Sequence, residues 1–128
     1  MDAKQALAEL VELSSQVRTA VVIGADGTVL AATSEDAEAA EGLRRSALEL
    51  VDAASDLHSG GEDVTRVEVE LEEGALFVVR TGDRAVAATT GPQPTSGLVV
   101  YDLRTCLQRI DEAAPKRRRK AARPKDGE

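Results

Sequence analysis

Apolar residues along the chain recur with two periods, one typical of helices and one typical of strands. In residues 3–16 they recur every three or four positions, which predicts an amphipathic helix. Asp2 followed three positions later by Gln5 resembles a capping box at the start of this helix. Residues 36–57 keep the same helical spacing for about five turns and predict a second helix.

Polar and glycine residues mark where these helices begin and end. Thr33 or Ser34 can cap the second helix, and Gly60-Gly61 are expected to stop it. After the loop "GPQPTSG", apolar residues at helical spacing predict a third helix that Pro115 ends. The third helix places one cysteine, Cys106, on its apolar side.

Strand patterns fill the intervals between the predicted helices. Residues 18–33, "RTAVVIGADGTVLAAT", predict a hairpin, because Asp26-Gly27 tolerates the positive φ of hairpin turns. Further along, the segment "VTRVEVELEEG" alternates strictly between apolar and charged residues, and "ALFVVRT" and "RAVAATT" predict two more strands.

Two of the predicted strands are apolar on both faces. These runs are Ala20–Ile23 and Leu76–Val79. Strands buried on both sides need helices above and below the sheet, so we expect both runs to be central strands. The predicted element order is helix-strand-strand-helix-strand-strand-strand-helix, which indicates an α+β fold.

The composition fits one domain. The chain has 128 residues, of which 42% are hydrophobic, and Phe77 and Tyr101 are its only aromatic residues. No segment approaches the roughly 18 apolar residues of a membrane span, and the N-terminus lacks the order of a signal peptide. A single cysteine suits a reducing compartment. We therefore expect a cytoplasmic protein.

Charge divides the chain into two parts. Residues 113–128 hold seven Lys/Arg and two Asp/Glu, a net +5; since the whole chain carries −7, residues 1–112 carry −12. We expect residues 1–112 to form the domain and residues 113–128 to be a disordered basic tail. The basic run comprises Lys116, Arg117, Arg118, Arg119 and Lys120.

Such a tail allows two interpretations. It can bind an anionic polymer or membrane surface weakly, in which case the binding is non-specific and sensitive to salt. It can equally be a solubilising segment or contact the acidic body of the same chain. The sequence favours neither.

No segment carries the pattern of a catalytic, cofactor or metal site. "GADGT" lacks the Gly-Lys-Ser/Thr ending of a phosphate-binding loop and leads into a strand. His58 is explained by a favourable interaction with a helix C-terminus. Glu68 and Glu70 belong to an alternating strand, not to a calcium loop. We predict no enzymatic activity and no cofactor.

The combination of elements resembles the roadblock/dynein light chain family. The opening "ALAELVELSSQVRTAVVIGADGTVLAAT", the long second helix and the segment "TSGLVVYDLRTCLQRID" are similar to the family pattern, over roughly residues 3–112. The resemblance implies a five-stranded antiparallel sheet with helices on both faces. It also implies a bacterial homodimer whose sheets join edge to edge, acting as a non-enzymatic regulator or scaffold of a small Ras-like GTPase.

Candidate interaction residues lie on the alternating strand and the second helix. The apolar side of the second helix can pack on its own sheet or meet the same helix of a second subunit, and the resemblance favours the dimer. If the strand pairs with its copy around Val67, Arg66 lies opposite Glu68 of the partner, which charge favours. Arg44 and Arg45 are the predicted contacts for the GTPase. The predicted dimer interface comprises Leu43, Ala47, Leu50, Arg66, Val67, Glu68 and Val69.

Two alternative functions remain open. A small-ligand sensor of the PAS or profilin-like kind would share the sheet and its flanking helices, although few aromatic or polar pocket residues are present. A nucleic-acid or membrane-surface binding protein would act through the basic tail.

Overall fold

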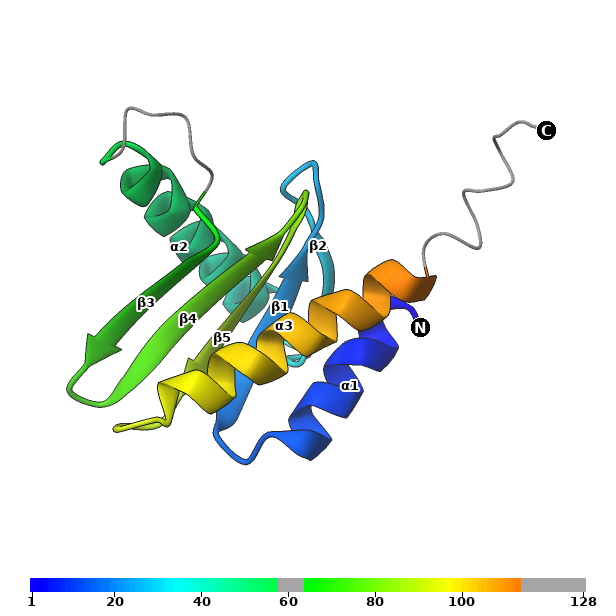
Figure 1. The fold of residues 1–128 in the computed structure, drawn as a ribbon, viewed down its shortest axis with the longest axis horizontal. Coiled ribbons are helices and arrows are strands. Elements are labelled where there is room, and N and C mark those ends of the chain that lie inside the picture. The colour runs from blue at the N-terminus through cyan, green and yellow to red at the C-terminus, as the bar shows by residue number, and fades with distance from the viewer. Residues whose placement is uncertain (58–63, 114–128) are drawn as a thin grey trace.

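One five-stranded antiparallel sheet organises the protein (Figure 1). The structure is a computed structural model and describes residues 1–57 and 64–113. The strand order is β2-β1-β5-β4-β3. The elements are α1 (Ala3–Leu13), β1 (Val17–Ile23), β2 (Val29–Ala32), α2 (Ala37–Ser55), β3 (Arg66–Leu71), β4 (Gly74–Thr81), β5 (Arg84–Thr90) and α3 (Ser96–Ala113). This architecture confirms the predicted α+β fold and element order.

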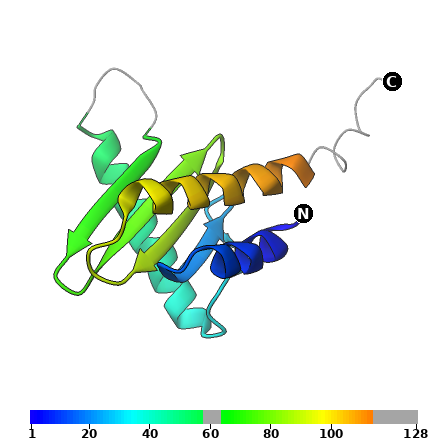
Figure 2. The same ribbon diagram turned by 60° about the horizontal axis from the view of Figure 1, so that its bottom comes forward.

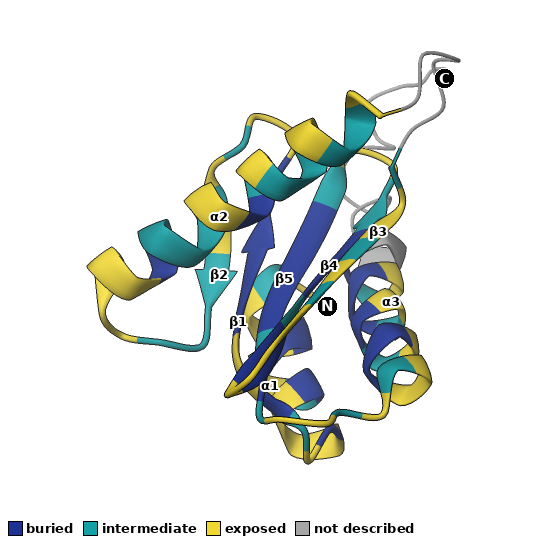
Figure 3. Cartoon of the chain, turned by 90° about the vertical axis from the view of Figure 1, so that its left-hand side faces the viewer, coloured by how far each residue is buried: buried dark blue, intermediate teal, exposed yellow. Residues whose placement is uncertain are grey.

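Helices cover both faces of the sheet. Helices α1 and α3 lie side by side on one face, and α2 crosses the other (Figures 2 and 3). The larger core cluster lies under α1 and α3, where Phe77, Leu103 and Leu107 are almost fully buried. The cluster under α2 is smaller and rich in alanine. The sheet is therefore more thinly covered on its α2 face.

The predicted capping box begins α1. The Asp2 carboxylate accepts a hydrogen bond from the Gln5 backbone N–H (2.8 Å), and the Gln5 side chain accepts one from the Asp2 N–H (3.1 Å). The helix ends at Leu13, three residues earlier than expected, because Ser14 has an extended backbone. The Ser14 hydroxyl accepts a hydrogen bond from the Gln16 N–H, so the chain turns there toward β1.

Helix α2 begins at a different cap from the one expected. The N-cap is Asp36, whose carboxylate accepts a hydrogen bond from the Glu38 N–H (3.0 Å). Thr33 is engaged elsewhere, since its hydroxyl accepts a hydrogen bond from the Ala20 N–H in β1. The Ser34 hydroxyl accepts one from the N–H of Asp36, and so positions the cap. The predicted stop at Gly60-Gly61 lies outside the described residues.

Strands β1 and β4 occupy interior positions, as their apolar runs predicted, but the middle strand is β5. Its residues Val86, Ala87 and Ala88 are fully buried. Alanine gives a weak apolar signal in the sequence, yet its small side chain lets helices approach both faces of the sheet. The central position of β5 in the sheet therefore depends on tertiary packing, and the sequence of the strand did not predict it.

The connection between β1 and β2 spans five residues, Gly24 to Thr28. Gly27 has the positive φ (85°) that the sequence predicted for this turn. The Asp26 carboxylate accepts hydrogen bonds from the Thr28 hydroxyl (2.7 Å) and the Thr28 N–H (3.1 Å), and these bonds lower the pKa of Asp26. The segment is thus a tight turn that leads into a strand.

Candidate interaction surface on α2 and β3

Strand β3 lies at the edge of the sheet, and its side chains alternate as predicted. Val67 and Val69 are half-buried on the α2 face, whereas Glu68 is exposed on the opposite face. The Arg80 N–H of β4 donates to the Thr65 carbonyl oxygen (2.8 Å). Because backbone polar groups alternate in direction along a strand, those of Arg66 and Glu68 point away from β4. Among the described residues no backbone group pairs with them, so a further strand could do so.

Apolar side chains also follow one flank of α2. Leu43, Leu50 and Leu57 are seven residues apart and share one side of the helix. Leu43 and Leu50 are half-buried, and Leu57, just after the helix, is 82% exposed. Leu71 at the end of β3 is 62% exposed. The α2–β3 surface, as we name it, comprises Leu43, Leu50, Leu57, Val67, Val69 and Leu71.

Ala47, one of the predicted interface residues, does not lie on this surface. Its side chain is completely buried and packs against the sheet of its own chain together with Val21, Val78 and Ala87. A small residue at this position lets α2 approach the sheet closely. The structure thus assigns Ala47 to the core of the single chain.

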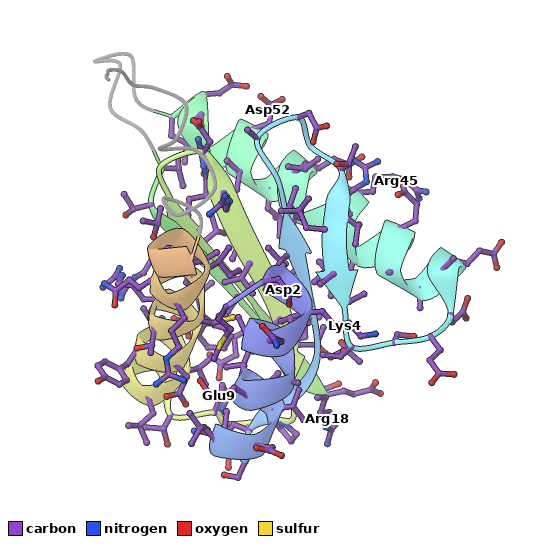
Figure 4. The ribbon with its side chains drawn as sticks, turned by 90° about the vertical axis from the view of Figure 1, so that its right-hand side faces the viewer. Asp2, Lys4, Glu9, Arg18, Arg45 and Asp52 are labelled. Carbon is purple, nitrogen blue, oxygen red and sulfur yellow. The ribbon has the colours of Figure 1, made fainter. Side chains whose placement is uncertain are left out.

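The two arginines predicted to contact a partner lie in different environments. The Arg44 guanidinium donates to the Glu41 carboxylate (Nε to Oε1, 2.9 Å) and to the Gly27 carbonyl oxygen (3.1 Å). Hydrogen bonding from Arg44 lowers the pKa of Glu41. Glu41 thus pairs with Arg44, three positions along the helix, and not with Arg45. Arg45 is exposed and projects from α2 (Figure 4).

The remaining candidates for chemistry have local structural explanations. Cys106 lies in the core under α3, where burial raises the pKa of its thiol to about 11. Within residues 1–57 and 64–113, no group of three or more His, Cys, Asp or Glu side chains could hold a metal ion. No described helix is long and apolar enough to cross a membrane. His58 and the basic run Lys116–Lys120 lie outside the described residues.

Two exposed members of the α2–β3 surface were missed by the sequence-based prediction. Leu57 follows Leu50 by seven residues, so the helical period could have included it. Leu71 follows Val67 and Val69 in the strand alternation. Their high exposure, however, depends on which elements cover them, and only the folded structure determines that.

The fold and the exposed strand edge define a class of protein, a single-sheet α+β domain of the roadblock type. Residues 3–90 match the Roadblock/LC7 domain family, and the chain belongs to this family. No curated protein matches the sequence.

Solved structures of similar proteins share the fold. The Roadblock/LC7 domain from Streptomyces avermitilis is similar with a TM-score of 0.77 and 22% identity, over 89% of this chain and 98% of that chain. The gliding protein MglB from Thermus thermophilus is similar with a TM-score of 0.69 and 17% identity, over 89% and 92% of the two chains. A structure described as MglB with tetrameric arrangement has a TM-score of 0.66 and 19% identity, over 89% and 88%.

Proposed function

We propose that the protein is a cytoplasmic bacterial homodimer that regulates or scaffolds a small Ras-like GTPase. Membership of the Roadblock/LC7 family supports this class of function, because the roadblock resemblance implies partnership with such GTPases. The observation that carries the proposal is the α2–β3 surface, which combines exposed apolar side chains with an edge strand.

Strand pairing supports a dimer. An edge strand with unpaired backbone groups is a template for another strand. Two copies of β3 would join the sheets edge to edge and bring the two α2 helices together over one face. Burial of Leu57 and Leu71, each more than half exposed in the single chain, would stabilise the dimer. A relative described as having a tetrameric arrangement is consistent with self-association.

The protein would act without covalent chemistry of its own. GTP hydrolysis needs phosphate-binding donors, a magnesium site and a positioned water, and the sequence lacks a phosphate-binding loop. Among the described residues, the shifted pKa values of Asp26 and Glu41 arise from neighbouring hydrogen bonds, and that of Cys106 arises from burial. Regulation would therefore work by binding one conformation of the GTPase switch regions more tightly than another.

Nucleotide-dependent binding tests this proposal. Small GTPases from the source cell, loaded with GDP or with a non-hydrolysable GTP analogue, would be titrated with the protein in a calorimeter. We expect different affinities for the two nucleotide states, and Arg45→Glu on α2 should weaken the tighter complex at least tenfold, or about 1.4 kcal/mol.

The matched control is Arg104→Glu, which reverses an exposed charge on α3 at the opposite face of the sheet. It should leave binding unchanged. Equal affinity of every GTPase for the protein in both nucleotide states would contradict a switch-reading regulator. Sedimentation of each variant separates loss of the dimer from loss of the partner contact.

A further inference from the structure

A cavity of about 220 Å³ lies between α2 and one end of the sheet. Its lining residues come from strands β1, β4 and β5 and the β1–β2 turn on one side and from α2 on the other. Ala25 and Asp83 are exposed at its rim, so the cavity opens to solvent. Its apolar lining comprises Ile23, Ala47, Leu48, Val51, Val78 and Ala85.

A short side chain and a fixed helix keep this space open. Ala85 of β5 lines the cavity, and its side chain is too short to fill it. The hydrogen bond from Arg44 to the Gly27 carbonyl oxygen ties α2 to the β1–β2 turn. The helix is thus held beside the turn, and the gap beneath it persists.

One cationic side chain lines the cavity. Arg80 is half-buried and lies two residues after Val78, on the same face of β4. No acidic side chain among the described residues pairs with its guanidinium. Asp83, the other charged group at the cavity, is exposed, so water screens its charge more strongly. The lining of the cavity is therefore mainly apolar, with one cationic side chain at its side.

We propose that this cavity binds a small carboxylate with a compact apolar body. The apolar part would lie against Leu48 and Val51, the half-buried apolar side chains that α2 contributes to the lining. The carboxylate would accept hydrogen bonds from the Arg80 guanidinium. An apolar cavity of roughly 150 Å³ is large enough to hold benzene, so the space here accommodates a ring that carries one carboxylate.

The site is separate from the α2–β3 surface. Leu48 and Val51 contact the cavity from one flank of α2, whereas Leu43 and Leu50 lie on the other flank. Formation of the proposed dimer would leave the cavity open. The proposal of a carboxylate site is therefore independent of the proposal of a GTPase partner.

Benzoate is a suitable probe, and its neutral analogue benzamide is the matched control. Each would be titrated into the full-length protein and followed by amide NMR spectra. We expect benzoate to shift the signals of Ile23, Leu48, Val51 and Ala85, with a Kd on the order of 1 mM for about nine heavy atoms. Benzamide should bind roughly tenfold more weakly, because it lacks the charge-assisted hydrogen bonds.

Two variants test the two halves of the site. Arg80→Gln should reduce benzoate affinity to that of benzamide, whereas Arg104→Gln on the opposite face of the sheet should leave it unchanged. Ala85→Leu should abolish binding of both compounds by filling the cavity. If Ala85→Leu fails to fold, Val51→Phe fills the same space from the helix side.

The outcomes are distinct. Selective benzoate binding that depends on Arg80 and on the open cavity supports the proposal. Equal binding of benzoate and benzamide, tighter binding of the cation benzylamine, or signal changes confined to α1 and α3 would overturn it. Absence of any shift at 20 mM benzoate, about 20 times the expected Kd, would overturn it as well.

Discussion

Arg44 of α2 donates a hydrogen bond to the carbonyl oxygen of Gly27, seventeen residues earlier in the chain (3.1 Å). The same guanidinium pairs with Glu41, so one side chain fastens the helix to the β1–β2 turn. An arginine that appeared from the sequence to be a free surface contact therefore has a role in the fold.

Removal of this connection should destabilise the domain. Arg44→Ala leaves the Gly27 carbonyl oxygen without its side-chain donor and should lower the midpoint of urea unfolding. Arg45→Ala, one residue away on the same helix but exposed, is the control and should have no measurable effect. Equal midpoints for the two variants would show that the Arg44 hydrogen bonds contribute nothing to stability.

Leu57 should affect association far more than folding. Leu57→Ala removes a side chain that is 82% exposed in the single chain, so the free energy of unfolding of the monomer should change by less than about 0.5 kcal/mol. Leu103→Ala, in the core under α3, should cost about 2–5 kcal/mol. Sedimentation should reveal a weaker dimer for Leu57→Ala, and an unchanged dimer constant would remove Leu57 from the interface.

Cross-linking tests the proposed register between two β3 strands. Since the backbone groups of Arg66 and Glu68 point outward, Val67 would face its copy in a non-hydrogen-bonded pair, with Cα atoms about 4.5 Å apart. That separation is compatible with a disulfide. Val67→Cys in a Cys106→Ala background should form a covalent dimer on oxidation, visible on a non-reducing gel. Glu68→Cys is the comparison, because its pairing needs a different register.

Cys106 should be chemically inert in the folded protein. Because burial raises the pKa of its thiol to about 11, only about one molecule in a thousand carries the thiolate at pH 8. We expect iodoacetamide to leave the native protein unlabelled and to label it fully in urea, as measured by mass spectrometry. Rapid labelling without urea would indicate that α3 opens frequently from the sheet.

The β1–β2 turn should respond to acid. The folded-state pKa of Asp26 is lowered by its hydrogen bonds from Thr28, so its stabilising effect is present above the unfolded pKa and is lost as pH falls through the folded pKa. Carboxyl NMR titration should give a pKa below 3.8 for Asp26. Thr28→Ala removes the hydroxyl donor and should raise this pKa.

The sequence by itself determined the order and type of the elements, the capping box at Asp2 and the positive φ of Gly27. These features depend on local periodicity and on single-residue conformational preference, which neighbouring residues in the chain already specify. The apolar runs of β1 and β4 likewise indicated their interior positions, because burial on both faces leaves a continuous hydrophobic pattern.

Only the tertiary structure decided which side chains meet across the fold. In the folded chain β5 lies at the centre of the sheet, and Asp36, not Thr33, caps α2. Ala47 is buried, and Arg44 donates a hydrogen bond to Gly27. Folding also brings Arg80 beside the apolar cavity under α2. These relationships join segments far apart in the chain, and no local pattern encodes them, because they depend on how the helices and the sheet pack together.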